Sequence, residues 1–281
     1  MQVGKLSSRV GVVGVVGAAP LVLVVRGHAP PTPTPTARHG VDTSTWSGCL
    51  GPDLQVVHGT ADLRQQTVLG VPQAVLTEAL AGYLVDDGVD GDRVAEHVRL
   101  VTGRPVVTRT MARSIGLCAG AVLYLRSVRR SPAIARVLVA GADRGPGLAA
   151  LLFACGLSDI SLWNVSDERW LPLRTATRDV DVIIDLLGSP YMDQLRVDLA
   201  EGSVVAADDF DPDATLAPGI LAGLAHNAAR RTDFDHKLMR RCVDGLADGA
   251  ERSGWPTAVT SPRVWAHLHD AVQTELTLRR L

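Results

Sequence analysis

The stretch RVLVAGADRGPGLAALLFACGLSDISLWNVSD, residues 136–167, decides the fold because its hydrophobic pattern alternates between two kinds of element. The apolar run RVLVAG predicts a short parallel strand that is buried on both faces. PGLAALLFACG then predicts a helix, and DISLWN predicts a second strand. Residues 180–188 and 203–210 predict a third and a fourth strand. Strands that alternate with helices in this way predict a doubly wound parallel sheet.

The loop GADRGPG, between the first strand and the helix, is similar to the glycine-rich pattern G-x-G-x-x-G of dinucleotide-binding proteins. In that pattern a tight turn presents backbone N–H groups and the positive end of a helix to a pyrophosphate. Gly141 matches the first glycine, but Asp143 replaces the second, and its negative charge opposes a diphosphate. Arg144 can offset that charge, and Gly145 and Gly147 lie nearby. The loop predicts a Rossmann-like domain, with these five residues as candidate cofactor ligands.

Asn164 ends the second strand, where an acidic residue usually bridges the ribose hydroxyl groups of NAD. An asparagine can still donate and accept hydrogen bonds there, and it does not repel the 2′-phosphate of NADP. We therefore predict that Asn164 lies near the ribose and that the cofactor, if one binds, is NAD or NADP without preference.

Composition and charge narrow the classes of function. The chain has 281 residues, of which 46% are hydrophobic and 21% are charged, as is typical of a globular protein with a sizeable core. The net charge of -2 gives no basic surface for nucleic acid. The four cysteines have no zinc-binding spacing, and we expect Cys118 and Cys155 to pack as small hydrophobic side chains.

The apolar stretch VGVVGVVGAAPLVLVV, residues 10–25, follows Lys5 and Arg9 and is similar to a signal peptide. However, it contains three glycines and a proline, Arg26 ends it, and no A-x-A cleavage site follows. At this length it is also short for a membrane span. The pattern therefore favours a strand or buried segment of a cytoplasmic protein, with export as the alternative.

The sequence predicts two domains, residues 1–130 and 131–281. The apolar spacing of residues 67–88 fits one face of a helix, and residues 112–130 are apolar nearly all round, which is typical of a long buried helix. RPVV, residues 104–107, predicts a brief strand between them, and residues 1–40 are expected to be irregular or strand-like. We expect a mostly helical first domain and C-terminal helices, broken at SGWP, that fold back toward it.

Several segments together resemble the malic enzyme family, especially its bacterial type, over residues 90–281. The long helix, the glycine loop and GLSDISLWNVSD run in the same order as in the cofactor domain of that family. LAPGILAGLAHNAARRTDFDHKLMRRCVDGLADG, residues 216–249, is the strongest match, and SPRVWAHLHDAV is similar to the family's closing helix. The resemblance implies a Rossmann-like cofactor domain, a homodimer, a small carboxylic acid as substrate, and Gly188 as a further cofactor-binding residue.

The metal-binding acids and the catalytic lysine of the family have no counterparts at the corresponding positions of this sequence. Its acidic metal-binding pair corresponds to Arg109 and Thr110, and its upstream metal-binding Glu falls at or near Arg93. Magnesium and manganese need hard oxygen ligands, and arginine in their place would repel the ion. The catalytic lysine has no counterpart either. We therefore predict no metal site and assign no catalytic residue.

Three functions remain open. Arg93, Arg109 and Arg113 could clamp a substrate carboxylate where the family has its metal, which predicts a diverged NAD(P)-dependent oxidoreductase that works without a divalent metal. Surface arginines in an arginine-rich chain are the plainer interpretation of the same residues. The second hypothesis is a non-catalytic malic-enzyme-like protein, or pseudoenzyme, kept for assembly or regulation. The third is an adenylating enzyme of the ubiquitin-activating type. All three predict that ordinary malic enzyme activity is absent or very low, with no membrane or nucleic acid as partner.

Overall fold

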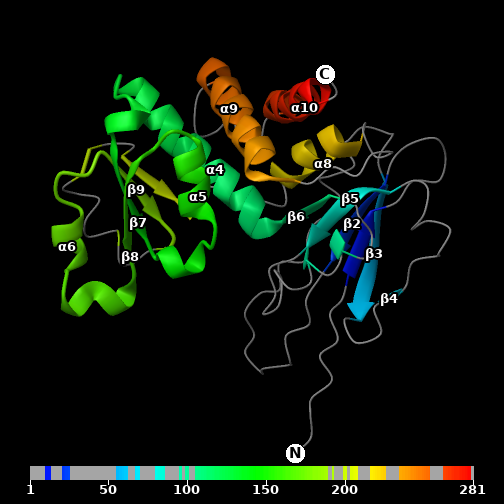
Figure 1. Cartoon of the computed structure of the whole chain (residues 1–281), viewed down its shortest axis with the longest axis horizontal. Helices are drawn as coiled ribbons and strands as arrows, with labels where there is room; N and C mark the ends of the chain where they lie inside the picture. Colours follow the sequence, from blue (N-terminus) through cyan, green and yellow to red (C-terminus); the bar gives the residue numbers. More distant parts are fainter. Residues whose placement is uncertain are drawn as a thin grey trace, which may run out of the picture. The chain divides into compact units, whose positions relative to one another are not determined.

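The chain forms two compact units that interleave along the sequence (Figure 1). The first unit comprises Met1–Arg109, Asp213–Phe234 and Leu268–Leu281, and the second comprises Thr110–Pro212 and Asp235–His267. The computed structural model describes residues 10–13, 21–25, 55–62, 67–69, 80–85, 95–96, 99–100, 105–188, 192, 199–200, 203–207, 216–225, 234–253 and 262–279. Residues 213–234 and 268–281 belong to the first unit, whereas residues 235–267 belong to the second, so the fold-back of the C-terminal helices toward the first domain stays a prediction. The boundary that the sequence predicts at residue 130 stays a prediction.

A six-stranded mixed sheet forms the first unit, in the order β4-β3-β1-β2-β5-β6. Its strands are β1 Val10–Val13, β2 Leu21–Val25, β3 Gln55–Asp62, β4 Thr67–Leu69, β5 Leu80–Val85 and β6 Val106–Thr108. β1 pairs antiparallel with β2 and β3, whereas β5 pairs parallel with β2 and β6. Helix α8, Ala217–Ala225, packs against β5 and β2. The strand-like character expected for residues 10–25 and the brief strand at RPVV are therefore confirmed where the chain is described.

The helix predicted over residues 67–88 is wrong at the described residues 67–69 and 80–85, which are strands. Ahead of the helix that starts at residue 109, the described residues lie mainly in strands rather than in the helices expected for this part. The physical reason lies in Leu80–Val85, a short apolar run that fits one helix face and a strand equally well. This segment forms a strand because it pairs with β2 on one side and with β6 on the other.

The second unit contains the sheet predicted from residues 136–210. Its strands β7 Arg136–Ala140, β8 Asp159–Trp163, β9 Val182–Asp185 and β10 Val204–Ala206 are all parallel, in the order β10-β9-β7-β8. Ala140 lies between Trp163 and Asp185, so the carboxyl ends of three strands meet at one edge. The doubly wound parallel sheet is confirmed.

Helices cover both sides of this sheet. Figure 1 shows α6, Leu173–Ala176, on one side of the strands, with α4, Arg109–Ser127, and α5, Leu148–Ala154, on the other. Helix α9, His236–Ser253, packs against α5. The long buried helix expected over residues 112–130 is α4, and the predicted C-terminal helices are α9 and α10, Pro262–Leu278.

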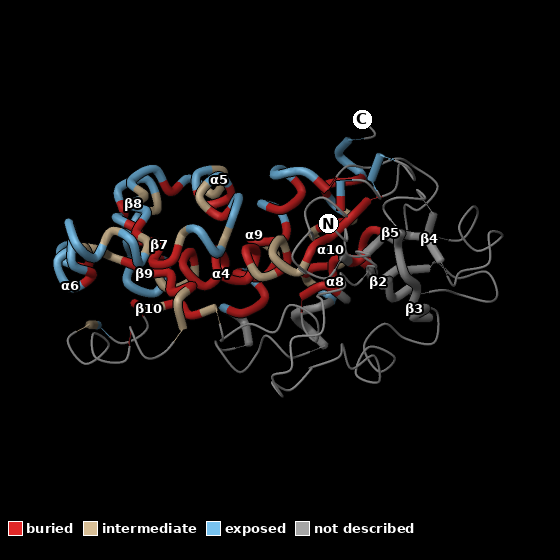
Figure 2. Tube along the Cα trace, turned by 90° about the horizontal axis from the view of Figure 1, so that it is seen from below, coloured by how far each residue is buried: buried red, intermediate tan, exposed pale blue. Residues whose placement is uncertain are grey.

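The buried residues lie mainly in β7, β9 and α4, as the red segments of Figure 2 show. On the α6 side of the sheet, Leu138, Ala140 and Ile183 pack with Leu173 and with Trp163, which is 1% exposed. The indole Nε1 of Trp163 donates to the Leu171 carbonyl at 2.8 Å, so this buried polar atom has its partner.

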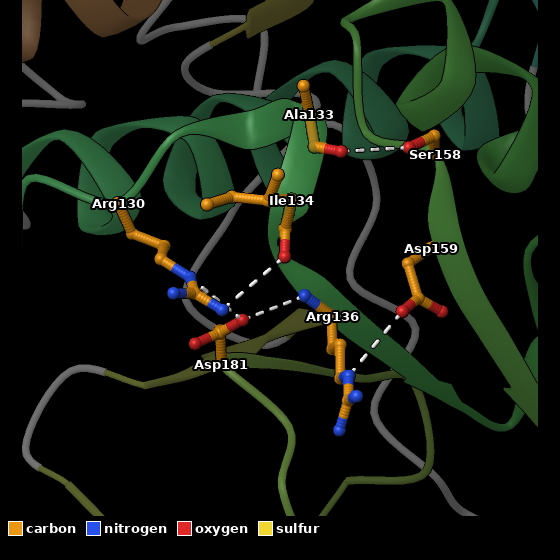
Figure 3. A network of polar contacts seen from close by, with 7 residues as sticks. All are labelled: Arg130, Ala133, Ile134, Arg136, Ser158, Asp159 and Asp181. Atoms are coloured by element: carbon orange, nitrogen blue, oxygen red, sulfur yellow. Dashed lines mark hydrogen bonds and ion pairs between the residues drawn. The ribbon is translucent and has the colours of Figure 1, made fainter.

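Polar contacts tie together the other edge of the sheet, where β7 and β8 begin (Figure 3). The Arg136 backbone N–H donates to Asp181 Oδ2 at 2.8 Å, and Arg130 Nε lies 3.3 Å from the same oxygen. The Arg136 guanidinium is 3.6 Å from Asp159 Oδ2. These side chains are largely exposed, so each ion pair contributes little stability.

Candidate functional site

The glycine loop begins at Gly141, directly after β7. Its φ of 83° lies in the left-handed region, which glycine adopts without strain. A Cβ atom at this position would lie 2.8 Å from Cδ2 of Leu187, in the segment that follows β9. Backbone angle and close approach both require glycine here, as the sequence pattern predicts.

Asp143 and Asn164 contact one another through the backbone of the loop. The Asp143 N–H donates to Asn164 Oδ1 at 2.9 Å. The Asn164 N–H in turn donates to Asp167 Oδ2 at 2.8 Å, at the start of a short 3-10 helix, Val165–Arg169. The side-chain oxygen of Asn164 thus holds the loop against the end of β8, the place where the sequence predicts a ribose.

The rest of the loop forms hydrogen bonds within itself. The Arg144 N–H donates to Gly141 O at 2.9 Å, and the Gly145 N–H donates to Ala142 O at 3.3 Å. A 3-10 turn, Ala142–Arg144, therefore precedes α5, which begins at Leu148 after Gly147 in the left-handed region. In an ordinary dinucleotide loop such N–H groups face the pyrophosphate. Here the chain itself uses several of them.

The Arg144 side chain crosses from the end of β7 to the end of β9. Its Nη1 atom donates to the Leu187 carbonyl at 2.8 Å and lies 3.3 Å from the Leu186 carbonyl. β8 lies on one side of β7 and β9 on the other, so the order of the strands reverses beside this loop. Open α/β sheets bind ligands at such a switch point. Arg144 thus brings a positive charge to this switch point.

Asp185 is a residue that the sequence analysis did not select. It is the last residue of β9 and is fully buried. Its Oδ1 atom accepts hydrogen bonds from the N–H groups of Leu187, at 2.9 Å, and Gly188, at 3.2 Å. Gly188 has a φ of 74°, so the carboxylate holds a left-handed turn in place. The sequence signal for Asp185 was its position: it is an acidic residue at the end of the apolar run VIID, at the carboxyl end of a strand.

The structure therefore brings the predicted cofactor residues together. The loop residues Gly141, Asp143, Arg144 and Gly145 contact either Asn164 or the Leu186–Gly188 segment. Gly147 lies at the start of α5, where a Cβ atom would meet nothing within 4 Å.

The predicted substrate residues are described only in part. Arg109 is the first residue of α4, and Arg113 follows one turn later; both side chains are partly buried. The Arg113 Nε atom is buried and has no hydrogen-bond partner among the described residues. Arg93 lies outside the described residues.

No group of three or more His, Cys, Asp or Glu side chains in the described part of the chain could hold a metal ion. No described helix is both long and apolar enough to cross a membrane.

Comparison with known proteins adds a fold relationship. No protein-family model and no curated protein sequence matches the chain. Among solved structures, the malic enzyme of Pyrococcus horikoshii has a TM-score of 0.57 at 15% identity, over 72% of this chain and 62% of that one. The NAD-dependent malic enzyme of Thermotoga maritima has a TM-score of 0.53 at 14% identity, over 69% and 67%.

The malic enzyme of Entamoeba histolytica also matches, with a TM-score of 0.57 at 14% identity, over 72% of this chain and 56% of that one. The chain thus spans less than two thirds of the Pyrococcus and Entamoeba enzymes. At such identities the likeness concerns the fold. The chain has a diverged malic-enzyme-like fold with a Rossmann-type parallel sheet.

Proposed function

We propose that the chain is a diverged NAD(P)-dependent oxidoreductase that acts on a small carboxylic acid without a divalent metal. In this proposal a nicotinamide dinucleotide lies at the carboxyl ends of β7 and β9, over Gly141–Gly147. The protein works in the cytoplasm, as a homodimer.

The position of the Arg144 guanidinium carries the proposal. It lies at the switch point and donates to the Leu187 carbonyl, a neutral acceptor that a diphosphate could replace. Hydrogen bonds from a guanidinium to a charged phosphate are stronger than those to a neutral carbonyl. A rotation of Arg144 from the carbonyl to the diphosphate would offset the charge of Asp143. The turn that Asp185 holds at Gly188 follows the same strand end, β9.

For the substrate, the proposal relies on Arg113 and Arg109, one helical turn apart on α4. A guanidinium binds a carboxylate through two parallel hydrogen bonds, which gives both charge and orientation. The Nε atom of Arg113, buried and without a hydrogen-bond partner among the described residues, is a suitable donor. We assign no proton-transfer residue.

A specific observation favours a second candidate, the non-catalytic malic-enzyme-like protein. The N–H groups of Asp143, Arg144 and Gly145 all donate within the chain, and Asn164 holds the loop in that form. A loop that has exchanged its ligand contacts for internal ones would keep the fold without the cofactor.

Calorimetric titration of NAD⁺ and NADP⁺, with and without Mg²⁺, separates the two candidates. Four proteins are compared, namely the wild type and the variants Asp143→Gly, Arg144→Ala and Arg136→Ala. We expect weak binding by the wild type, independent of Mg²⁺. Asp143→Gly should bind about tenfold more tightly, because a screened, exposed charge is removed from the diphosphate.

Arg144→Ala should weaken binding about tenfold, because the charged donor is lost. Arg136→Ala is the matched control, since it removes an exposed arginine from the opposite edge of the sheet. Tighter binding by Arg144→Ala would instead mean that the guanidinium only occupies the place of the diphosphate. If no protein binds either cofactor, the oxidoreductase proposal fails and the non-catalytic one stands. Oxidative decarboxylation of malate with Mg²⁺ should be absent or very slow in all four.

A further inference from the structure

The two edges of the parallel sheet in the second unit differ in exposure. At the β10 edge, Val205 and Ala206 are buried. At the β8 edge, Asp159, Ser161 and Leu162 are exposed, and no strand among the described residues pairs with β8 on the side away from β7. Proteins commonly protect such an edge with a proline, a bulge or a covering segment. β8 contains no proline and pairs with β7 residue for residue, so its outer edge is open to a further strand.

The backbone of β8 offers hydrogen-bonding groups along this edge. The Gly141 N–H donates to Trp163 O at 2.7 Å, which fixes the direction of the peptide groups of β8. The N–H and C=O groups of one residue lie on the same side of a strand, and that side alternates from residue to residue. Every second residue counted back from Trp163 therefore faces β7, and the N–H and C=O groups of Ile160 and Leu162 face outward.

The side chains of these two outward-facing residues are apolar. Trp163 packs on the α6 side of the sheet, and successive side chains of a strand point to opposite faces. Ile160 and Leu162 thus point to the face that α5 covers. Leu162 is nevertheless 55% exposed, and Phe153 of α5 is 67% exposed. β8 and parts of α5 are accordingly pale blue in Figure 2. A partner at this edge would meet both free backbone groups and apolar side chains.

We propose that β8 pairs antiparallel with β8 of a second copy of the chain, across a two-fold axis at Ser161, which joins two four-stranded sheets edge to edge. Ile160 then lies opposite Leu162 of the partner subunit, and the reverse pair is related by the axis. Both members of each pair face outward, so each pair exchanges two hydrogen bonds. A shift by one residue would set outward-facing groups against groups that already bond β7.

Charge decides among the registers that keep these hydrogen bonds. Asp159 is the one charged residue of β8. With the axis at Ser161, the two Asp159 side chains are four residues apart, about 14 Å along the strands, which exceeds the screening length of about 8–10 Å. With the axis at Ile160 they would be only about 7 Å apart along the strands. The edge is therefore complementary to itself, as a two-fold interface requires.

The size of the contact predicts a reversible dimer. Stable complexes bury about 800 Å² on each partner. An aromatic side chain offers about 150–250 Å², so Phe153, at 67% exposed, adds roughly 100–170 Å² to a five-residue strand pair. This total lies at the low end of specific interfaces, so we expect the dimer to dissociate on dilution.

Sedimentation velocity of the full chain over a wide range of concentrations is the first test. The wild type should shift from monomer to dimer as its concentration rises. Leu162→Arg should raise the dissociation constant at least about tenfold, because it removes an apolar contact and places two like charges across the axis. Val128→Arg is the matched control, since Val128 follows α4 and is 51% exposed; it should dimerise like the wild type.

A second test reads the register directly. Opposed residues that do not exchange hydrogen bonds have Cα atoms about 4.5 Å apart, a distance that a disulfide spans. Ser161→Cys should therefore give a dimer linked through residue 161 on mild oxidation, which peptide mapping identifies. Asp159→Cys is the control on the same strand and should stay unlinked, because its two copies are too far apart.

A wild type that stays monomeric at every concentration would overturn the proposal, and this measurement needs no substitution. A dimer that Leu162→Arg leaves unchanged, or a disulfide through residue 159 instead of 161, would also overturn it. The inference names an interface for the proposed homodimer but does not depend on a cofactor, because sedimentation is measured without ligand. Loss of dimerisation and failure to bind NAD⁺ or NADP⁺ are thus separate outcomes.

Discussion

Replacing glycines of the cofactor loop by alanine separates two effects that the structure makes distinct. Gly141 and Gly147 both have a φ of 83°, so alanine meets the same backbone strain at either position. At Gly147 a Cβ atom would meet nothing within 4 Å, whereas at Gly141 it would lie 2.8 Å from Leu187 Cδ2. The difference between the two variants therefore measures how closely the loop packs against the segment after β9.

The expected magnitudes follow from these contacts. A left-handed alanine costs about 1–2 kcal/mol, and the reduced freedom of the unfolded chain returns about 0.4–1 kcal/mol. Gly147→Ala should thus lower the free energy of unfolding by about 0.5–1 kcal/mol. Gly141→Ala carries an added packing cost of about 1–2 kcal/mol, because the methyl end of Leu187 can move only in part. The melting temperature of Gly141→Ala should therefore lie about 3–8 °C below that of Gly147→Ala.

Urea unfolding followed by tryptophan fluorescence measures the difference, because Trp163 lies in the core beside this loop. Far-UV circular dichroism of the same samples checks that unfolding has two states. Gly156→Ala is a second control, since its φ is 89° and it too has open space around a Cβ atom. Equal losses at Gly141 and Gly147, or a larger loss at Gly147, would refute the close packing of Gly141 against Leu187.

Two further predictions concern the second unit. Trp163→Phe should lower the free energy of unfolding by about 1–2 kcal/mol, because the Leu171 carbonyl loses its donor and the core loses volume. Trp170→Phe is the control: this residue is 85% exposed, so its substitution should change the free energy of unfolding by less than about 0.5 kcal/mol in the same denaturation assay. Burial raises the pKa of Asp244 in the folded state, so the folded protein binds this proton more tightly and the carboxylate is destabilising above that pKa. Asp244→Asn should therefore be more stable than the wild type at pH 7, and this difference in stability should vanish as the pH falls through the folded-state pKa of Asp244. If the urea midpoints of the two proteins differ by the same amount at acidic pH, the prediction is contradicted.

The sequence by itself determined the parallel sheet and its helices. RVLVAG and VDVIIDLLG are apolar runs bounded by glycine or polar residues, and they become the buried parallel strands β7 and β9. DISLWN becomes the largely exposed edge strand β8. Gly141 was likewise predictable, because the turn after a first strand of this type needs a left-handed residue. The order of these segments also led to the malic-enzyme-like fold that the solved structures share.

Only the tertiary structure decided the first sheet and the state of the cofactor loop. The local sequence of Leu80–Val85 does not favour a strand over a helix. The segment forms a strand because β2 and β6 pair with it. The positions that Asp143, Arg144 and Asn164 occupy are visible in the sequence, but their hydrogen bonds to one another and to the Leu186–Leu187 carbonyls depend on where β8 and β9 end.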